Sequence, residues 1–337
     1  MSKTYRVAIV GATGAVGLKF IECIEQRKFP CSEVVLYAST KSEGKVLHVN
    51  GKPCRIVGLT PERVEKFDFA FFSAGSGISK EYAPLFAKKG AVVVDNSSAW
   101  RMDPGTPLVV PEVNPADIWK HKGIIANPNC SAIISITPLW PVHRKNRIKR
   151  MIISTYQAAS GAGAAAMEEL RESTRAYLEG RKFEHKVLPH PYAFNAFSHN
   201  TKIDPATAHN EEETKVINET RKIFGDPNIA IGITCVRIPV LRAHCVSVTF
   251  ECEKPITPEE VREILSTAPG VRVVDDQARN YFPMPVDASG TDEILVGRIR
   301  RDLSDSTGRS ISIFSAGDQL LKGAALNAVQ IAEKLLA

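Results

Sequence analysis

One cysteine in this chain stands in a setting that suits nucleophilic chemistry. Cys130 belongs to the polar segment NPNCSA (127–132), which follows a short strand pattern, GIIA (123–126), and precedes an apolar stretch with helical spacing, AIISITPLW (132–140). The spacing predicts that Cys130 lies near a helix N-terminus, where the macrodipole and free amide groups favour a thiolate and can hold an oxyanion. A cysteine is most often a small buried hydrophobe. The sequence context therefore supports a reactive and a structural role for Cys130 equally.

The other cysteines indicate neither a disulfide framework nor a metal site. The chain has seven cysteines, an odd number, and none are spaced as Cys-x-x-Cys. We therefore expect no metal and a reducing, cytoplasmic location. The role of a small buried hydrophobe fits Cys23, Cys235 and Cys252.

A glycine-rich turn near the N-terminus predicts a dinucleotide site. GATGAVG (11–17) follows the apolar run YRVAIV (5–10) and opens a segment with helical spacing (14–27). Glycine is required there because the turn is tight and because the backbone must approach a pyrophosphate at the helix N-terminus. A glycine triplet alone is a weak signal, but the strand–turn–helix context makes it strong. The expected contacts are Gly11, Thr13, Gly14, Ala15, Val16 and Gly17.

The end of the second predicted strand indicates which dinucleotide binds. NAD sites usually place Asp or Glu at this point, to hold the ribose 2′-hydroxyl. Here the strand at 33–38 is followed by Ser39, Lys41 and Ser42, whose cation and hydroxyls suit a 2′-phosphate. NADP is therefore favoured over NAD. Glu43 is the competing residue, but it lies past the hydroxyl cluster, and the alternative is an ordinary polar turn.

The elements that must position these residues form two groups. Before residue 130, short apolar runs alternate with helical segments, which predicts an open α/β domain with a parallel sheet. The strands are expected at 5–10, 33–38, 67–73 and 91–95, and helices at 14–27 and 79–89. The later part has strands of mixed spacing with helices grouped between them, which is typical of an α+β domain. Its strands are expected at 151–158, 231–238, 244–252 and 294–300, and helices at 164–179, 211–224, 258–267 and 317–335.

Composition excludes several classes of protein. The chain has 337 residues, of which 44% are hydrophobic and 24% charged, which suits two globular domains. The net charge of +6 is modest, and the basic run 143–150 lacks interleaved aromatic residues, so we expect no nucleic-acid partner. No apolar run reaches about 18 residues and the N-terminus lacks a signal-peptide layout, so we expect no membrane association.

A cysteine nucleophile combined with a nicotinamide cofactor implies one type of reaction. The thiolate attacks a carbonyl, and hydride then moves between a thiohemiacetal and nicotinamide by way of a thioester. Such chemistry needs an acid or base near neutrality, for which histidine is the default. None of the eight histidines is singled out by the residues alone, and His185 and His190 are interpreted as part of a polar loop.

Taken together, these motifs resemble the bacterial type of aspartate-semialdehyde dehydrogenase over essentially the whole chain. The matching segments are GATGAVG (11–17), SAGSGISKEYAP (73–84), DNSSAWR (95–101), VPEVN (110–114), NPNCSAI (127–133), TYQAASGAG (155–163), EETK (212–215), RIPVLRAH (237–244), VGRIRRD (296–302) and KGAALNAVQIAE (322–333). The resemblance implies a Rossmann-type NADP-binding domain at 1–130, completed by a C-terminal helix at 316–337, and a catalytic and dimerisation domain at 131–315. It also implies a homodimer.

The resemblance assigns roles to particular residues. Cys130 matches the nucleophile, Asn129 stands beside it, Gln157 matches the glutamine that orients substrate, and His244 matches the general acid/base. The implied substrate contacts are phosphate at Arg101 and Lys215, the amine at Glu212, and the α-carboxylate at Arg237. Ordinary surface cations, a first-turn helix acid and hydrogen-bonded strand residues are the alternatives for these positions.

Further cofactor contacts are implied at the nicotinamide side. Ser160 and Gly161 match a turn there, and Ser39, Lys41 and Ser42 match the 2′-phosphate loop. One position departs from the family pattern: Gln319 stands where an asparagine usually holds the nicotinamide amide. A glutamine can form the same bonds from a longer stem.

The reaction implied by the resemblance reduces β-aspartyl phosphate with NADPH, releasing phosphate and aspartate β-semialdehyde, in the biosynthesis of lysine, threonine, methionine and diaminopimelate. Two alternatives remain open. An N-acetyl-glutamyl-phosphate reductase would share the glycine turn and the cysteine, but its acetylated substrate has no use for a carboxylate at Glu212. A catalytically inactive dinucleotide sensor is disfavoured by the presence of both Cys130 and His244.

Overall fold

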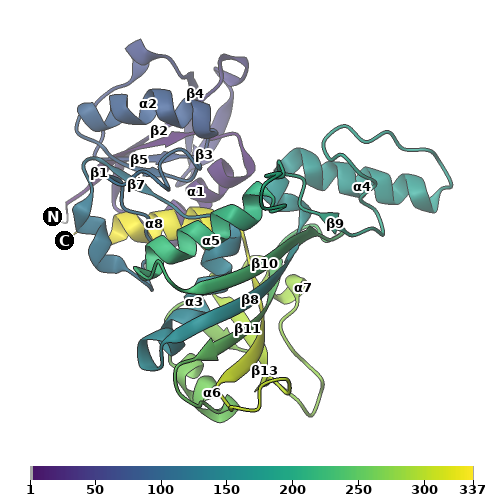
Figure 1. Ribbon diagram of the computed structural model, residues 1–337. Coiled ribbons are helices and arrows are strands. Elements are labelled where there is room, and N and C mark those ends of the chain that lie inside the picture. The colour runs from purple at the N-terminus through teal and green to yellow at the C-terminus, as the bar shows by residue number, and fades with distance from the viewer. Residues whose placement is uncertain (1–2, 337) are drawn as a thin grey trace. The chain divides into compact units, whose positions relative to one another are not determined.

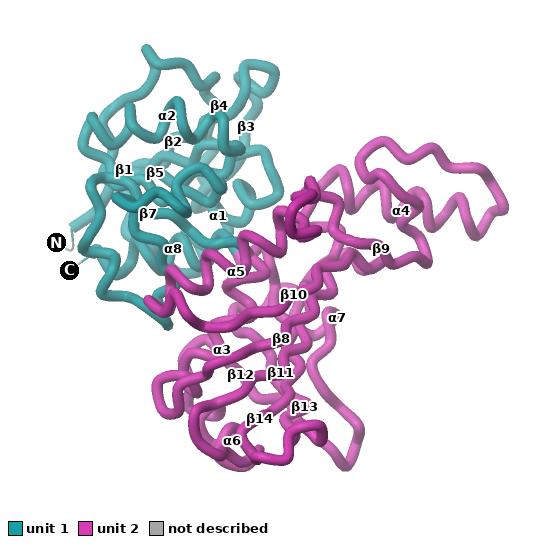
Figure 2. Tube along the Cα trace, viewed as in Figure 1, with its two compact units in different colours: residues 1–129, 324–337 teal, residues 130–323 magenta. Residues whose placement is uncertain are grey.

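The computed structural model describes residues 3–336, and these divide into two compact units (Figures 1 and 2). Unit 1 comprises the residues up to Asn129 together with those from Ala324 onward, and unit 2 comprises Cys130–Gly323. Each unit contains its own seven-stranded sheet. In the described residues, no helix has the length and apolar character needed to cross a membrane.

Unit 1 is built on a largely parallel sheet, as the alternation of apolar runs and helices predicts. The strand order is β3-β4-β2-β1-β5-β6-β7, and only the pairing of β3 with β4 is antiparallel. The strands are β1 (Tyr5–Val10), β2 (Cys31–Ala38), β3 (Val46–Val49), β4 (Lys52–Gly58), β5 (Phe69–Phe72), β6 (Val92–Asp95) and β7 (Ile124–Ala126). The helices are α1 (Ala15–Gln26), α2 (Ser76–Lys88) and α8 (Leu326–Glu333). The strands predicted near 5–10, 33–38, 67–73 and 91–95 are confirmed, whereas β3 and β4 were not predicted.

Buried apolar side chains hold this unit together. β1 and β5 consist almost entirely of buried residues, as expected for central strands covered on both faces. α8 packs beside α1 and β6, and Arg27 donates two hydrogen bonds, both 2.6 Å long, to the carboxylate of Glu333. The C-terminal helix therefore completes the unit that begins the chain.

Unit 2 contains a mixed sheet in the order β12-β13-β14-β11-β8-β10-β9. Its strands are β8 (Ile148–Gln157), β9 (Phe197–Ser198), β10 (Ala230–Arg237), β11 (His244–Cys252), β12 (Val271–Val273), β13 (Ile294–Arg301) and β14 (Ser310–Gly317). Its helices are α3 (Cys130–Lys145), α4 (Ala164–Leu178), α5 (Glu211–Phe224), α6 (Pro258–Ser266) and α7 (Pro285–Ala288). α3 packs against β8, β11, β13 and β14, and α5 packs against β10, whereas α4 projects away from the sheet (Figure 1).

One prediction about the last helix is wrong. The chain at 317–335 was expected to be one helix, but β14 extends to Gly317, a turn follows, and a π-helical segment at Leu321–Ala325 precedes α8. The strand β14 was not predicted, although SISIF (310–314) alternates polar and apolar residues as a strand does, and its pairing with β11 and β13 fixes it in the structure.

Candidate active site

The predicted nucleophile lies at the start of the longest helix described in unit 2. Cys130 is the first residue of the 16-residue α3 and is partly buried, which confirms the predicted strand-to-helix setting. Gly323 leaves room beside it, since a Cβ there would lie 3.0 Å from the Cβ of Cys130. The helix N-terminus supplies the positive end of a dipole to this thiol.

His244 begins β11 and is completely buried. Its Nδ1 accepts a hydrogen bond of 3.0 Å from the backbone N–H of Ala158. Its Nε2 has no hydrogen-bond partner among residues 3–336. Burial, reinforced by the charge of Arg237, lowers the pKa of His244 to about 3, so the ring is neutral at physiological pH.

The residues before His244 are held by two consecutive side chains. Ala243 has a left-handed backbone with φ of +68°, and its N–H donates to Oε1 of Gln319 at 2.9 Å. Asp318, which is buried, forms a 2.7 Å ion pair with Arg242. A left-handed non-glycine residue is strained and persists only where its surroundings enforce it. The turn after β14 therefore fixes the position of His244.

Gln319 has a well-defined place in this arrangement. It is buried, its amide oxygen accepts from Ala243, and its Nε2 donates to the hydroxyl of Ser160. The structure thus brings Gln319 together with Ser160, as the resemblance predicts for two residues of one site. Within unit 2 this amide links the Ser160 turn to the segment that carries His244.

Arg237, at the end of β10, is 4% exposed and held from three sides. Its Nε donates to Oδ1 of Asn200 at 2.8 Å, its Nη1 donates to the carbonyl of Ala158 at 3.3 Å, and its Nη2 lies 3.0 Å from Nε2 of His199. A guanidinium has five N–H donors, so each terminal nitrogen keeps one for another acceptor. The arrangement presents a preorganised receptor for a carboxylate.

His199 and Asn200 were not predicted as site residues. His199 is 7% exposed, and burial lowers its pKa to about 4, so its neutral ring can accept from Arg237. Both residues lie in the irregular segment that follows β9. The local sequence gives no sign that these two residues belong to the site, because only tertiary packing brings their segment next to β10.

Gln157 and Glu212 meet in the same buried region. Thr155 donates to Oε1 of Gln157 at 3.0 Å, and Nε2 of Gln157 donates to Oε1 of Glu212 at 3.2 Å.

Glu212 is 6% exposed on the first turn of α5, and Lys215 follows it on the same helix. The Lys215 ammonium lies 3.8 Å from a carboxylate oxygen of Glu211, and its side chain is 30% exposed. The thiol helix, the Gln157–Glu212 pair and the Arg237–His244 region thus all belong to unit 2.

Unit 1 contains a cavity of about 430 Å³ at the glycine-rich turn. Its lining includes Gly11, Thr13, Gly14, Ser39 and Ser73. Gly11 has a φ of +88°, and a Cβ there would lie 2.3 Å from the backbone oxygen of Ser73. Glycine is therefore obligatory at this position, as the turn motif predicts. Ala15, Val16 and Gly17 form the first turn of α1, with the helix N-terminus beside the cavity.

The segment after β2 carries the predicted 2′-phosphate residues. Ser39 lines the cavity, and Lys41 and Ser42 follow it in a short 3-10 turn, with Lys41 exposed. Glu43, the competing acid, is 2.6 Å from the guanidinium of Arg63. The carboxylate of Glu43 is therefore paired with a cation. The ammonium of Lys41 and the nearby serine hydroxyls are the groups of this segment that suit a phosphate.

Arg101 and Asn129 are buried residues of unit 1. Arg101 donates from Nε to the carbonyl of Asn127 at 3.0 Å and from Nη2 to the carbonyl of Asn96 at 2.9 Å. These contacts fix the guanidinium within unit 1. Asn129 is the last residue of the unit before Cys130.

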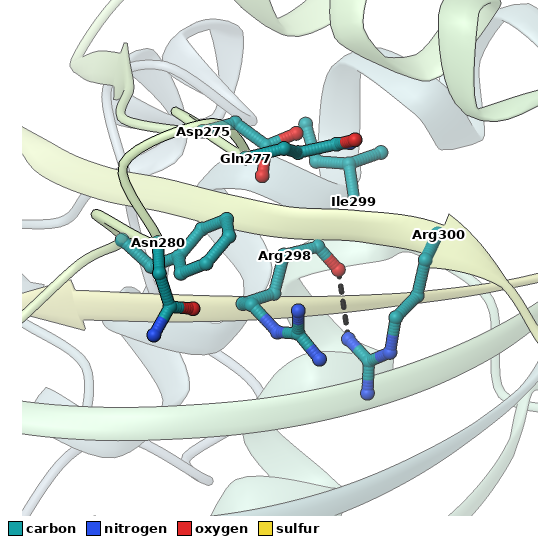
Figure 3. Close-up of a pocket in the computed structure, with 7 residues that line it drawn as sticks. Asp275, Gln277, Asn280, Arg298, Ile299 and Arg300 are labelled. Atoms are coloured by element: carbon teal, nitrogen blue, oxygen red, sulfur yellow. Dashed lines mark hydrogen bonds between the residues drawn. The ribbon is translucent and has the colours of Figure 1, made fainter.

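Another cavity, of about 270 Å³, lies on unit 2 where β13 is irregular (Figure 3). It is lined by Asp275, Gln277, Asn280, Phe282, Arg298, Ile299 and Arg300, none of which is a predicted site residue. Arg298 has a φ of +52° and stacks over Phe282. In residues 3–336 there is no cluster of His, Cys, Asp or Glu suited to a metal ion.

Two models of known protein families match this chain and show the class of protein to which it belongs. Residues 6–121 match the semialdehyde dehydrogenase NAD-binding domain, and residues 139–322 match the semialdehyde dehydrogenase dimerisation domain. The two-part α/β fold class predicted from the sequence is thereby confirmed.

Relatives over the full length define the family. Aspartate-semialdehyde dehydrogenase from Aquifex aeolicus is 53% identical over 98% of each chain, and that from Bacillus subtilis is 42% identical over 99% of this chain and 98% of its own. A crystal structure of aspartate semialdehyde dehydrogenase II from Vibrio cholerae matches with a TM-score of 0.94 and 40% identity, over 99% of each chain, and another of that enzyme is described as complexed with ASA. The chain belongs to the aspartate-semialdehyde dehydrogenase family, as the resemblance indicated.

Proposed function

We propose that this protein catalyses the NADPH-dependent reductive dephosphorylation of β-aspartyl phosphate to aspartate β-semialdehyde, through a thioester on Cys130. The observation that carries this proposal is the buried site in unit 2, where a thiol at a helix N-terminus shares one unit with a carboxylate receptor and a neutral histidine. Family membership supplies the substrate class, and these residues supply suitable chemistry.

Cys130 attacks the acyl carbon, and phosphate leaves to give the thioester. The N-terminus of α3 favours the thiolate that this step needs. Asn129 stands beside the thiol in sequence. We assign the phosphate contacts to Arg101, a buried guanidinium, and Lys215, a partly exposed ammonium. We assign the role of general acid/base to His244, whose Nε2 has no hydrogen-bond partner among residues 3–336.

The amino-acid part of the substrate is held by opposite charges. Arg237 offers a fixed guanidinium to the α-carboxylate, and Glu212 offers a carboxylate to the α-ammonium. Gln157 donates to Glu212 and so orders it. Charge-assisted hydrogen bonds of this kind contribute about 1.5–3 kcal/mol each. The pair therefore selects a free α-amino acid over an acetylated one.

The nucleotide site suits NADP. The glycine turn leaves space for a pyrophosphate, and Ser39, Lys41 and Ser42 suit the 2′-phosphate. The nicotinamide side is assigned to Ser160, Gly161 and Gln319 in unit 2. When bound, NADPH supplies the hydride that reduces the thioester.

The protein is further proposed to be a cytoplasmic homodimer. Unit 2 matches a dimerisation domain, and one side of its sheet carries partly exposed apolar residues, such as Ile152 at 41% exposure. A reducing compartment keeps the nucleophilic thiol of Cys130 available.

One assay tests the activity and its nearest alternative. The purified protein should reduce NADP on free aspartate semialdehyde only when phosphate is present, and it should prefer this substrate to the N-acetyl analogue. Glu212→Gln should lose that preference, because it removes the partner of the ammonium. A parent enzyme that prefers the acetylated compound would overturn the substrate assignment, and a protein that binds NADP without turnover would indicate a sensor.

A further inference from the structure

We propose that the hydroxyl of Tyr192 is a further substrate-binding group, which donates a hydrogen bond to the same carboxylate that Arg237 binds. This role deepens the proposed function and rests on it for the identity of the substrate. Tyr192 lies in the irregular segment between α4 and β9, and it belongs to none of the segments that carry the family resemblance.

Apolar packing fixes the ring of Tyr192 beside the carboxylate receptor. Tyr192 is completely buried and lies in one apolar cluster with Ala159. Its ring meets that of Phe197 edge to face, with the ring centres 5.5 Å apart. Phe197 pairs with Arg237 between β9 and β10, and Ala159 follows Ala158, whose carbonyl accepts a hydrogen bond from Arg237. The residues packed around Tyr192 are therefore the neighbours of Arg237.

The hydroxyl of Tyr192 is buried and has no hydrogen-bond partner among residues 3–336. A buried hydroxyl without a partner lowers stability, so folded proteins rarely keep one unless a ligand uses it. Burial raises the pKa of Tyr192 to about 12, so the phenol keeps its proton at neutral pH. Tyr192 therefore offers a ligand a neutral hydrogen-bond donor.

Tyr192 and Arg237 act on each other without being hydrogen-bonded. Burial lowers the pKa of Arg237, and among the groups that oppose this shift Tyr192 has the largest effect, ahead of Glu212. Arg237 in turn lowers the pKa of Tyr192, against the larger effect of burial. Such interactions weaken with distance, so the two groups are neighbours. Since the hydroxyl accepts no hydrogen bond from the guanidinium, an anionic oxygen placed between them could accept from both.

A carboxylate fits this set of donors. Its two oxygens accept up to about four hydrogen bonds. Arg237 keeps one free N–H on each terminal nitrogen, because Ala158 and His199 engage the others, and the Tyr192 hydroxyl adds a third donor. A substrate without the carboxylate would leave both the guanidinium and the hydroxyl unpaired in a buried site. The hydroxyl therefore strengthens the selection of an α-amino acid over a simple amine.

Tyr192→Phe removes the hydroxyl and keeps the ring. The value of kcat/KM for aspartate semialdehyde should fall about 10- to 100-fold, mostly through KM, as expected for losing a hydrogen bond to a charged group. The value for 3-aminopropanal, which has the aldehyde and the amine but no carboxylate, should stay the same. Tyr177→Phe, at an exposed tyrosine of α4, should change neither value. An equal loss for both substrates would overturn the proposal, because it would show that the hydroxyl supports the fold of the site and not carboxylate binding.

The second measurement needs no substrate. Because the hydroxyl is unpaired in the ligand-free protein, Tyr192→Phe should keep or raise the midpoint of urea unfolding. Tyr37→Phe provides the contrast: the hydroxyl of Tyr37 donates to the carbonyl of Arg63 at 2.8 Å, so its removal should lower the midpoint. A Tyr192→Phe protein as destabilised as Tyr37→Phe would show that the Tyr192 hydroxyl has a structural partner, which would refute its role as a free donor.

The third measurement separates the role of Tyr192 from the proposed function. L-2-aminobutyrate has the carbon skeleton, amine and carboxylate of aspartate semialdehyde but no aldehyde, and propylamine lacks the carboxylate as well. In calorimetric titrations, the Kd of L-2-aminobutyrate should rise about 10- to 100-fold in Tyr192→Phe, whereas propylamine should bind parent and variant equally. A parent that does not turn over aspartate semialdehyde would refute the proposed function, and this titration would still decide the role of Tyr192. Equal Kd values for L-2-aminobutyrate in parent and variant would exclude Tyr192 from carboxylate binding.

Discussion

The two candidate sites are built by different means. The nucleotide cavity of unit 1 lies at a tight backbone turn, where a Cβ on Gly11 would lie 2.3 Å from the backbone oxygen of Ser73. The site of unit 2 is formed by buried polar side chains, among them Gln157, Arg237 and His244, from three strands. The first needs glycine at particular positions of one local turn, and the second needs particular side chains brought together from distant parts of the chain.

This difference has an energetic counterpart. Polar groups at a backbone-built turn remain near solvent and cost little when no ligand is bound. Buried polar groups must satisfy one another, and Arg237 does so through Asn200, Ala158 and His199. The site of unit 2 is therefore expected to be coupled to stability and to pH more strongly than the site of unit 1.

The largest expected effect separates the two sites completely. Cys130→Ala should abolish turnover, by a factor on the order of 10⁶, because the covalent step loses its nucleophile. NADP binding, measured by fluorescence titration, should be unchanged. In the parent, Cys130 should be the first cysteine alkylated near neutral pH, and substrate should protect it, with Cys54→Ala as a control that stays active. Loss of activity in step with the labelling of another cysteine would refute the assignment.

The next effect concerns pH and stability. A histidine in the unfolded chain has a pKa near its ordinary value of 6.5, but burial lowers the pKa of folded His199 to about 4 and that of folded His244 to about 3. The unfolded state thus holds more protons below about pH 6.5, so stability falls as the pH drops through that window. At about 1.4 kcal/mol per pH unit for each histidine, the loss should reach about 4 kcal/mol by pH 5.

Urea unfolding at pH 7, 6 and 5, followed by tryptophan fluorescence, measures this slope. His244→Gln should flatten it, because one of the two groups is removed. His48→Gln, at an exposed position of unit 1, serves as the control and should leave the slope unchanged. A stability that is constant between pH 7 and pH 5 would show that the buried histidines are protonated in the folded state.

Sequence alone could predict the site of unit 1 because its determinants are local. A strand, a glycine turn and a helix are encoded in consecutive residues, and the structure places Gly11, Thr13 and Gly14 around a cavity. The same holds for Cys130, whose place at the start of α3 follows from neighbouring residues.

Sequence could not reveal what supports the site of unit 2. His199 and Asn200 reach Arg237 only because β9 pairs with β10, and β9 has two residues without a detectable pattern. The strand β14 was likewise missed, and with it the turn that holds Ala243 through Gln319. The resemblance named Gln157, Glu212 and Arg237, but their mutual contacts depend on strand pairing across the unit.

A smaller effect tests the fixed guanidinium of unit 2. Arg237→Lys keeps the charge but loses the planar fork, and it leaves Asn200, His199 and the carbonyl of Ala158 without their donor. The loss in kcat/KM for aspartate semialdehyde should correspond to about 1.5–3 kcal/mol. Arg147→Lys is the matched control, since Arg147 is an exposed arginine of the same unit, paired with Asp226 and Glu253. An Arg237→Lys enzyme with unchanged kinetics would exclude this arginine from substrate binding.

The smallest expected effect lies in unit 1, at the 2′-phosphate segment. Lys41 is exposed, so solvent and salt screen its charge, and Lys41→Ala should reduce kcat/KM for NADPH by about tenfold, the low end for a charge-assisted hydrogen bond. The value for NADH should stay the same, because NADH has no 2′-phosphate. Lys45→Ala, an exposed lysine shortly after Lys41, should affect neither cofactor. The ratio of kcat/KM for NADPH to kcat/KM for NADH should be measured at low and high salt. This ratio should fall as salt rises in the parent and should stay constant in Lys41→Ala. A parent enzyme that uses NADH as well as NADPH would overturn the cofactor assignment.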